Sequence, residues 1–276
     1  MVGRDSFWEP PHIMIYGGVM LAVALGFAAW RIHRNTLWRN IALALLAIPL
    51  VVAPFDEVWH AIFGKEDITS VWIIWSPPHV ALVLAIVWAF VLLLPFLRKE
   101  ETDVRYVVGG GMFATFLFAA SFLVIPLMPE GQFHLLGWWG PVARAGLFTL
   151  IVLYGARLLG GYMPAFMIAL WYGLFSGIGA GVGVKSASII MLPHFEFPTW
   201  VYLFAIVSLA LTVDLLRRSP ARITGTAAGF AWGFILYGAG SYFVPTEFSY
   251  SVSDMLTAIV STTAGGLIAG TIVDYV

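Results

Sequence analysis

The stretch PPHVALVLAIVWAFVLLLPFL, residues 77–97, decides the fold class, because it contains no Asp, Glu, Lys or Arg. A helix that crosses the hydrocarbon core of a bilayer needs about 20 mainly apolar residues. Comparable segments occur at 13–31, 40–60, 105–128, 138–158, 161–183, 198–216, 223–244 and 255–273. The sequence therefore predicts an all-α integral membrane protein, a helical bundle of about nine (seven to nine) transmembrane helices. The segments 161–183 and 255–273 are rich in small residues and are expected to pack against other helices.

The composition of the whole chain supports this class. Of its 276 residues, 61% are hydrophobic and 11% are charged, against roughly 25% charged residues in soluble domains. No polar linker interrupts the chain, so we expect one polytopic membrane domain over 1–276, in contact with the lipid bilayer. The absence of cysteine excludes disulfides, thiolate catalysis and iron–sulfur clusters. A net charge of −1 gives no reason to expect nucleic acid as a partner, and the N-terminal residues do not have the pattern of a signal peptide.

The basic residues predict the orientation. With nine helices and the N-terminus outside, ten basic residues are cytoplasmic: Arg31, Arg34, Arg39, Arg98, Lys99, Arg105, Arg157, Arg217, Arg218 and Arg222. The outer side then holds only Arg4, Lys65, Arg144 and Lys185. This asymmetry follows the positive-inside rule, so we expect the N-terminus outside and the C-terminus cytoplasmic, in the inner (cytoplasmic) membrane of a cell. Five of the six histidines are then on the outer side: His12, His60, His79, His134 and His194.

The segment PFDEVWHAIFGKEDITSVWIIWSPPHVALV, residues 54–82, contains the strongest candidate site. Asp56 and His60 are four residues apart, so on a helix they share one face, with about 5–6 Å between their Cβ atoms. His79 follows Pro77 and Pro78, which suit the first turn of the next helix. One carboxylate and two imidazoles at adjacent helix ends suit copper(II), zinc or non-haem iron(II). The alternative is an Asp56–His60 ion pair with an unrelated histidine at the membrane interface.

A repeated pattern adds further candidate ligands. WEPPH (8–12) and WSPPH (75–79) differ at one position, and each precedes an acid-x-x-x-His motif two helices later. The pattern predicts an internal repeat of 8–60 and 75–134, with chance similarity as the alternative. Such repeats often form a site at their interface. The additional metal-ligand candidates are His12, Glu130 and His134.

The stretch from Asp56 to His79 resembles the metal-site segment in the third, metal-binding membrane subunit of particulate methane and ammonia monooxygenases. In that family an Asp-x-x-x-His motif ends one helix and Pro-x-His opens the next, as Asp56, His60 and His79 do here. The stretch is also similar to bacterial membrane proteins with a DxxWH…SPxH signature. The resemblance implies copper at these residues, on the outer side of the membrane, with oxidative chemistry. The loop is longer here, and a second cluster of the family's form is missing from this sequence.

These features are consistent with three functions. The first is a copper-monooxygenase-type oxidoreductase, or a subunit of one in a homo- or hetero-oligomer, with a small lipophilic substrate that enters from the bilayer. The second is a metal-handling transporter, but the segments 77–97 and 105–128 offer almost no polar groups along which an ion could pass. The third is an accessory subunit of a membrane redox complex with no chemistry of its own.

Overall fold

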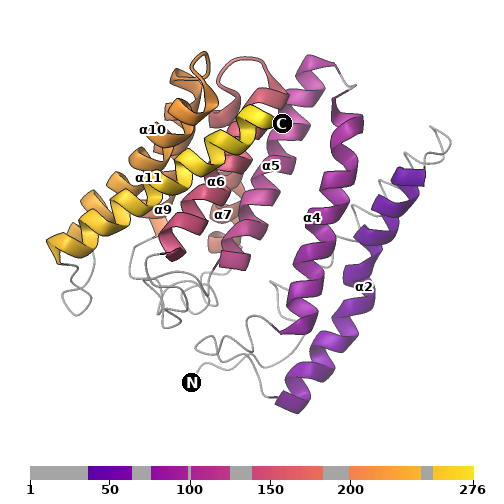
Figure 1. The fold of residues 1–276 in the computed structure, drawn as a ribbon. Coiled ribbons are helices and arrows are strands. Elements are labelled where there is room, and N and C mark those ends of the chain that lie inside the picture. Colours follow the sequence, from indigo (N-terminus) through magenta and orange to yellow (C-terminus); the bar gives the residue numbers. More distant parts are fainter. Residues whose placement is uncertain (1–36, 64–75, 99–100, 125–138, 183–198, 244–250) are drawn as a thin grey trace. The chain divides into compact units, whose positions relative to one another are not determined.

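A computed structural model of the chain describes residues 37–63, 76–98, 101–124, 139–182, 199–243 and 251–276 (Figure 1). Within these ranges every regular element is a helix. In chain order the elements are α2 (Leu37–Phe63), α4 (Pro77–Leu97), α5 (Thr102–Val124), α6 (Trp139–Leu159), α7 (Pro164–Val182), α9 (Thr199–Leu215), α10 (Ala221–Gly233), the π-helical turn η2 (Phe234–Ala239), the 3-10 turn η3 (Gly240–Phe243) and α11 (Val252–Tyr275). The predicted all-α fold class is confirmed for the described residues.

Four of the described helices are long and apolar enough to cross a membrane. They are Leu43–Phe63 in α2, Pro77–Pro95 in α4, Trp139–Leu159 (α6) and Val252–Tyr275 in α11. Each segment predicted from 40–60 onward coincides with helical structure, whereas 13–31 lies outside the described residues. The helices are those of a multi-pass membrane protein, and the number of nine spans stays a prediction.

The chain divides into two compact units. The first comprises Met1–Lys99 with Gly179–Ile189, and the second comprises Glu100–Ile178 with Ile190–Val276. Helices α2 and α4 belong to the first unit, and α5, α6, α9, α10 and α11 to the second. The predicted repeat includes stretches outside the described residues and stays a prediction, as does the single membrane domain.

In the first unit, α2 and α4 pack against each other as an antiparallel pair. Ser76 caps the start of α4, because its Oγ accepts a hydrogen bond from the backbone N–H of His79 at 3.4 Å. Pro77 and Pro78 occupy the first helical positions, where no intrahelical donor is required. The proline-rich start of α4 therefore fixes the position of His79 within its first turn.

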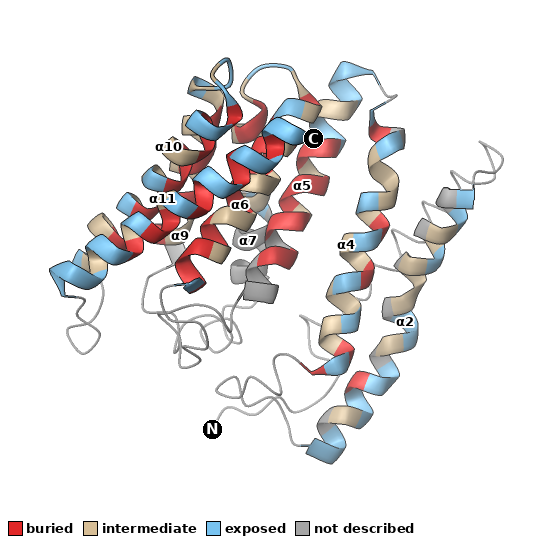
Figure 2. Ribbon diagram, in the orientation of Figure 1, coloured by how far each residue is buried: buried red, intermediate tan, exposed pale blue. Residues whose placement is uncertain are grey.

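In the second unit, α11 packs closely against both α6 and α10, and the buried residues of these three helices face one another (Figure 2). Glycines make this approach possible. A Cβ atom on Gly265 would lie 2.3 Å from the carbonyl oxygen of Val142 in α6, and one on Gly266 would lie 2.1 Å from that of Gly225 in α10. The expected packing of the small-residue segment 255–273 against other helices is therefore confirmed.

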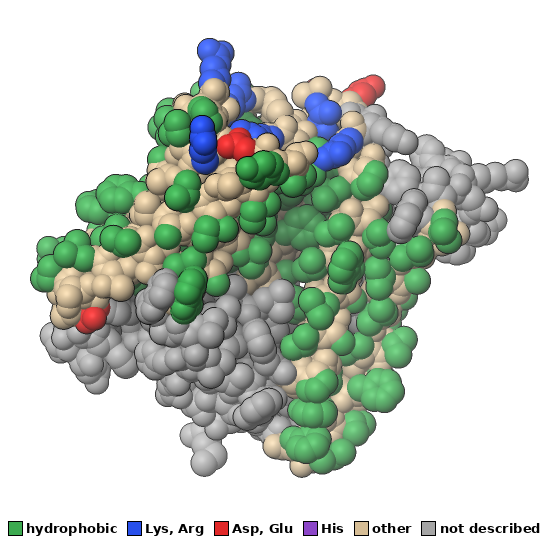
Figure 3. Space-filling view, viewed as in Figure 1, with side chains coloured by type: hydrophobic (Ala, Val, Ile, Leu, Met, Phe, Trp, Pro, Cys, Tyr) green, Lys and Arg blue, Asp and Glu red, His purple; other side chains and the backbone are tan. Residues whose placement is uncertain are grey.

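Basic side chains of the second unit gather at one end of it, near the C-terminus, and apolar side chains cover its flanks (Figure 3). Arg105 Nε donates to the carbonyl oxygen of Leu159 at 3.3 Å, and Arg217 Nη1 donates to that of Gly161 at 2.6 Å. Among the described residues of this unit, the basic side chains other than that of Arg144 belong to this group: Arg105, Arg157, Arg217, Arg218 and Arg222.

Two aspartates near helix C-termini cap the N-termini of other helices. The Asp214 carboxylate accepts hydrogen bonds from the backbone N–H groups of Ala165 and Phe166, at 3.0 and 2.8 Å. Asp274 likewise accepts from Ala221 and Arg222, at 3.0 and 3.2 Å. Each carboxylate satisfies two of the donors that a helix start leaves without an intrahelical partner, and its negative charge is favourable beside the positive end of the helix dipole.

Replacement of Asp214 by alanine is expected to lower the free energy of unfolding by about 1–2 kcal/mol, since two N–H groups of α7 lose their acceptor. Thermal unfolding in detergent would measure the loss. Glu101→Ala serves as the control, because Glu101 is an exposed acid that precedes α5. Equal stability of the two variants would show that the cap contributes nothing.

Candidate metal centre

The two helices of the first unit bring Asp56 and His79 together. Helix α2 continues to Phe63, so Asp56 lies seven residues before its end, which is about 10 Å along the helix axis. The segment predicted from the sequence ended at residue 60, three residues too early. Because α2 extends past the start of α4, Asp56 lies level with the first turn of α4 and reaches His79.

The contact joins a buried carboxylate to a mostly buried imidazole. His79 Nε2 and Asp56 Oδ1 are 3.2 Å apart, and their side chains are 16% and 2% exposed. A carboxylate removed from water requires a compensating charge, hydrogen bond or metal ion. The geometry allows either of two states: a direct ion pair between an imidazolium and a carboxylate, or two ligands of one metal ion.

The third candidate ligand, His60, lies on α2 one turn after Asp56. Residues four apart share a helix face, so the His60 position lies on the same face of α2 as Asp56. Its side chain is not among those described. Among the side chains that are described, no group of three or more His, Asp or Glu gathers as a metal cluster.

The other predicted ligands belong to segments between or before the described helices. His12, Glu130 and His134 lie outside the described residues, as does His194. The predicted second metal position therefore stays a prediction, together with the larger site that the repeat suggests.

Near Asp56, the exposed side of α2 carries large apolar side chains. Phe55, Val58 and Ile62 are 63%, 53% and 67% exposed. The rings of Trp59 and Phe63 also lie against each other, with 4.3 Å between their centroids. The exposed apolar side chains therefore lie on other faces of α2 than the buried Asp56 carboxylate, and are suited to contact with lipid.

A buried arginine in the second unit is a further candidate functional residue. Arg144, in α6, is 1% exposed. Its guanidinium carbon lies 5.0 Å from the ring centroid of Tyr202 in α9 and 5.4 Å from that of Trp232 in α10. The charge pattern of the sequence places Arg144 among the basic residues of the outer side and does not predict this cluster. A signal was present, because an ionisable residue within an apolar helix usually faces the bundle interior and has a role there.

No known protein family, curated protein or solved structure matches this chain. The interpretation of the site therefore depends on its own residues, and the resemblance to the monooxygenase subunit depends on residues 56–79.

Proposed function

We propose that this chain is a multi-pass membrane metalloprotein in which Asp56, His60 and His79 hold a copper ion near the outer face of the membrane. In this proposal it acts as a copper-monooxygenase-type oxidoreductase or as a subunit of one. The observation that carries the proposal is the 3.2 Å contact between His79 Nε2 and the buried Asp56 Oδ1.

The length of this contact suits two ligands of one ion. Two donors about 2.0–2.1 Å from a common metal lie about 3.3–3.4 Å apart at tetrahedral angles and about 2.8–3.0 Å apart at right angles. The observed separation falls between these values, so both atoms can bind one ion with little movement. His60 has its position on the same helix face as Asp56, and its side chain would complete a set of three ligands.

The donor types support copper, zinc or iron rather than magnesium or calcium. Two imidazoles and one carboxylate suit copper(II), zinc and non-haem iron(II), and the resemblance of residues 56–79 to the monooxygenase subunit favours copper among them. Copper with three protein ligands keeps open coordination positions and would supply redox chemistry with dioxygen there. The protein would orient the ion and compensate its charge with the Asp56 carboxylate, and a lipophilic substrate would enter from the bilayer.

The distribution of charge supports nine spans with the N-terminus outside and the C-terminus cytoplasmic. In the first unit, Arg39 near the start of α2 and Arg98 just after α4 lie at the opposite end of the helix pair from Asp56 and His79. In the second unit, arginines gather at the end that holds the C-terminus. If both arginine-rich ends are cytoplasmic, as the positive-inside rule favours, the metal centre faces outward.

Metal analysis of the purified protein tests the proposal. Protein prepared in detergent without chelator, after growth with added copper, is expected to contain about one copper per Asp56–His60–His79 site. Asp56→Asn, His60→Ala and His79→Ala should each weaken copper binding by more than the roughly 10–100-fold that loss of an outer-shell partner costs. Glu57→Gln is the matched control, because Glu57 is the exposed neighbour of Asp56 on the same helix. Electron paramagnetic resonance of the copper(II) form should show two coordinated nitrogens in the wild type and one in any copper that His79→Ala still binds.

Two results would contradict the proposal. Wild-type protein that binds no metal after supplementation would leave the Asp56–His79 contact as an ion pair that joins α2 to α4, and would favour an accessory subunit. Copper that is unaffected by Asp56→Asn and His79→Ala would belong to other ligands. If copper is bound here, dioxygen uptake with a hydrophobic substrate would indicate oxidation, and copper flux into liposomes would indicate transport.

A further inference from the structure

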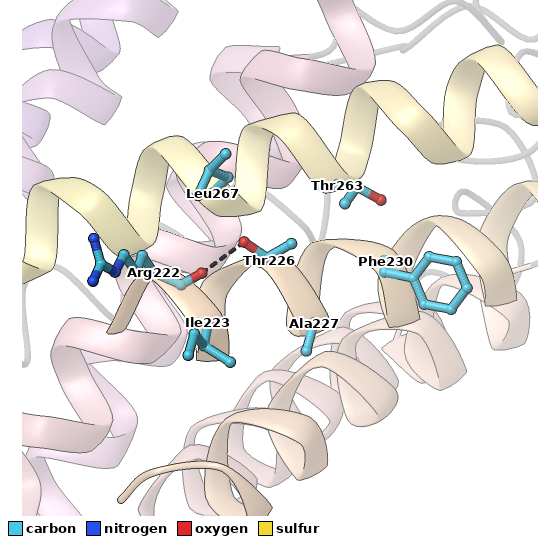
Figure 4. A pocket seen from close by; sticks show the side chains of 7 residues that line it. All are labelled: Arg222, Ile223, Thr226, Ala227, Phe230, Thr263 and Leu267. Atoms are coloured by element: carbon cyan, nitrogen blue, oxygen red, sulfur yellow. Dashed lines mark hydrogen bonds between the residues drawn. The ribbon is translucent and has the colours of Figure 1, made fainter. Parts of the chain in front are cut away.

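A groove of about 570 Å³ lies along the surface of α10 and α11 in the second unit (Figure 4). Arg222 lies at one end and Phe230 at the other, with Ile223, Ala227 and Leu267 between them. Arg222 and Phe230 are eight residues apart on continuous helix, which corresponds to about 12 Å along the axis. The groove is therefore an open, elongated depression with a single charged end.

The walls of the groove are effectively apolar. The two hydroxyl groups that line it are already bonded within their own helices. Thr226 Oγ1 donates to the carbonyl oxygen of Arg222 at 2.6 Å, drawn as a dashed line in Figure 4, and Thr263 Oγ1 donates to that of Ile259 at 2.7 Å. Neither hydroxyl therefore has a proton left to donate to a ligand, whereas a hydrocarbon chain would bury apolar surface along the groove.

The charged end belongs to the end of the second unit at which its basic side chains gather (Figure 3). Arg222 is exposed in the first turn of α10, beside the last turn of α11. The nearby carboxylate of Asp274 is engaged by two backbone N–H groups and by Arg157 Nη2 at 3.6 Å. In the described part of the chain, Asp274 and Arg222 interact through their charges, but no hydrogen bond or ion pair joins the Arg222 guanidinium to another group. Its hydrogen-bond donors can therefore bind a further anion.

We propose that this groove binds an anionic phospholipid, with one acyl chain along Ile223, Ala227 and Leu267 and the phosphate at the Arg222 guanidinium. An exposed arginine beside an open apolar groove is complementary to a lipid that has a negative headgroup and a hydrocarbon tail. Guanidinium binds phosphate oxygens through paired, charge-assisted hydrogen bonds, and a basic residue at the membrane surface favours anionic over neutral lipid by about fivefold. This site is independent of the metal centre.

Native mass spectrometry of the full-length protein tests the proposal. The probes are phosphatidylglycerol and phosphatidylcholine with identical acyl chains. Wild-type protein should retain phosphatidylglycerol with about fivefold preference, and Arg222→Gln should remove that preference. Arg218→Gln is the control for charge, because Arg218 is an exposed arginine at the same end that does not line the groove. Glycerol phosphate without acyl chains should not compete.

Filling the groove provides a second, independent variant. Ala227→Phe should reduce retention of both lipids, whereas Ala264→Phe, at an exposed position of α11 outside the groove, should not. Thermal unfolding would verify that each variant remains folded. The proposal is overturned if wild-type protein retains both lipids equally, if Arg218→Gln has the same effect as Arg222→Gln, or if the two phenylalanine variants retain lipid alike.

Discussion

Replacement of Gly266 by alanine is expected to lower the free energy of unfolding of the second unit by about 3 kcal/mol, at the upper end of the range for overpacked cores. The added methyl group would lie 2.1 Å from the carbonyl oxygen of Gly225 and 2.9 Å from the Cα atom of Gly229. Both obstructing atoms belong to the backbone of α10, so no side chain can rotate away. The whole of α10 would have to move from α11.

The contact at Gly266 is one of several of the same kind between these helices. A Cβ atom on Gly225, Gly229 or Gly270 would each lie 2.3 Å from a backbone oxygen of the facing helix. Small residues at four-residue spacing allow this approach of helix backbones in membranes, where lipid provides no hydrophobic force between helices. Displacement of one helix would therefore loosen the remaining close contacts as well.

Gly173→Ala is the matched control for this prediction. Gly173 lies within α7, and a Cβ atom there would meet nothing within 4 Å. The same substitution should therefore leave stability unchanged or raise it by up to about 1 kcal/mol, through higher helix propensity. Thermal unfolding in one detergent would compare the two variants. If Gly266→Ala unfolds at the same temperature as Gly173→Ala, this result would contradict the close approach of the α10 and α11 backbones.

The helices themselves could be predicted from the sequence, because an uninterrupted apolar stretch such as 77–97 has few structural alternatives in a bilayer. The contact between Asp56 and His79 also followed from local information, since both residues flank one connection between two adjacent helices. The end of α2 was predicted less accurately than the helix itself, at residue 60. The reason is that Ala61, Ile62 and Phe63 can lie equally well in a helix or in a loop at the interface.

Contacts between distant segments could not be predicted in the same way. The proximity of Asp214 to Arg217 and Arg218 in sequence suggests an ion pair at a helix end, whereas its carboxylate caps α7, some 50 residues earlier in the chain. The π-helical turn after Gly233 likewise has no evident sequence signal. Such features depend on which helices become neighbours. The pattern of apolar residues does not specify the neighbours of a helix that is apolar on all sides.

The buried arginine of α6 provides the second large expected effect. Arg144→Ala should lower the free energy of unfolding by about 3–5 kcal/mol, comparable to truncation of a large aromatic side chain in a core. Two causes act together: the truncation leaves a cavity, and the faces of Tyr202 and Trp232 lose the cation beside them. Arg144→Lys keeps the charge but should still lower the free energy of unfolding by about 1–2 kcal/mol, because a compact, strongly hydrated ammonium replaces the planar guanidinium beside the two rings.

A double-mutant cycle would separate the cation–π contribution from simple loss of volume. The coupling energy between Arg144→Met and Tyr202→Leu should be about 1 kcal/mol, while Tyr202→Phe keeps the ring and should preserve most of it. Arg157→Met in the same helix is the control, because the Arg157 side chain is 40% exposed and paired only with Asp274 and a backbone carbonyl among the described residues. Arg157→Met should lower the free energy of unfolding by less than about 1 kcal/mol. Two results would show that the rings do not hold the guanidinium: a coupling energy near zero, or equal losses of unfolding free energy from the substitutions at Arg144 and Arg157. The loss of stability at Arg144 would then be due to burial alone.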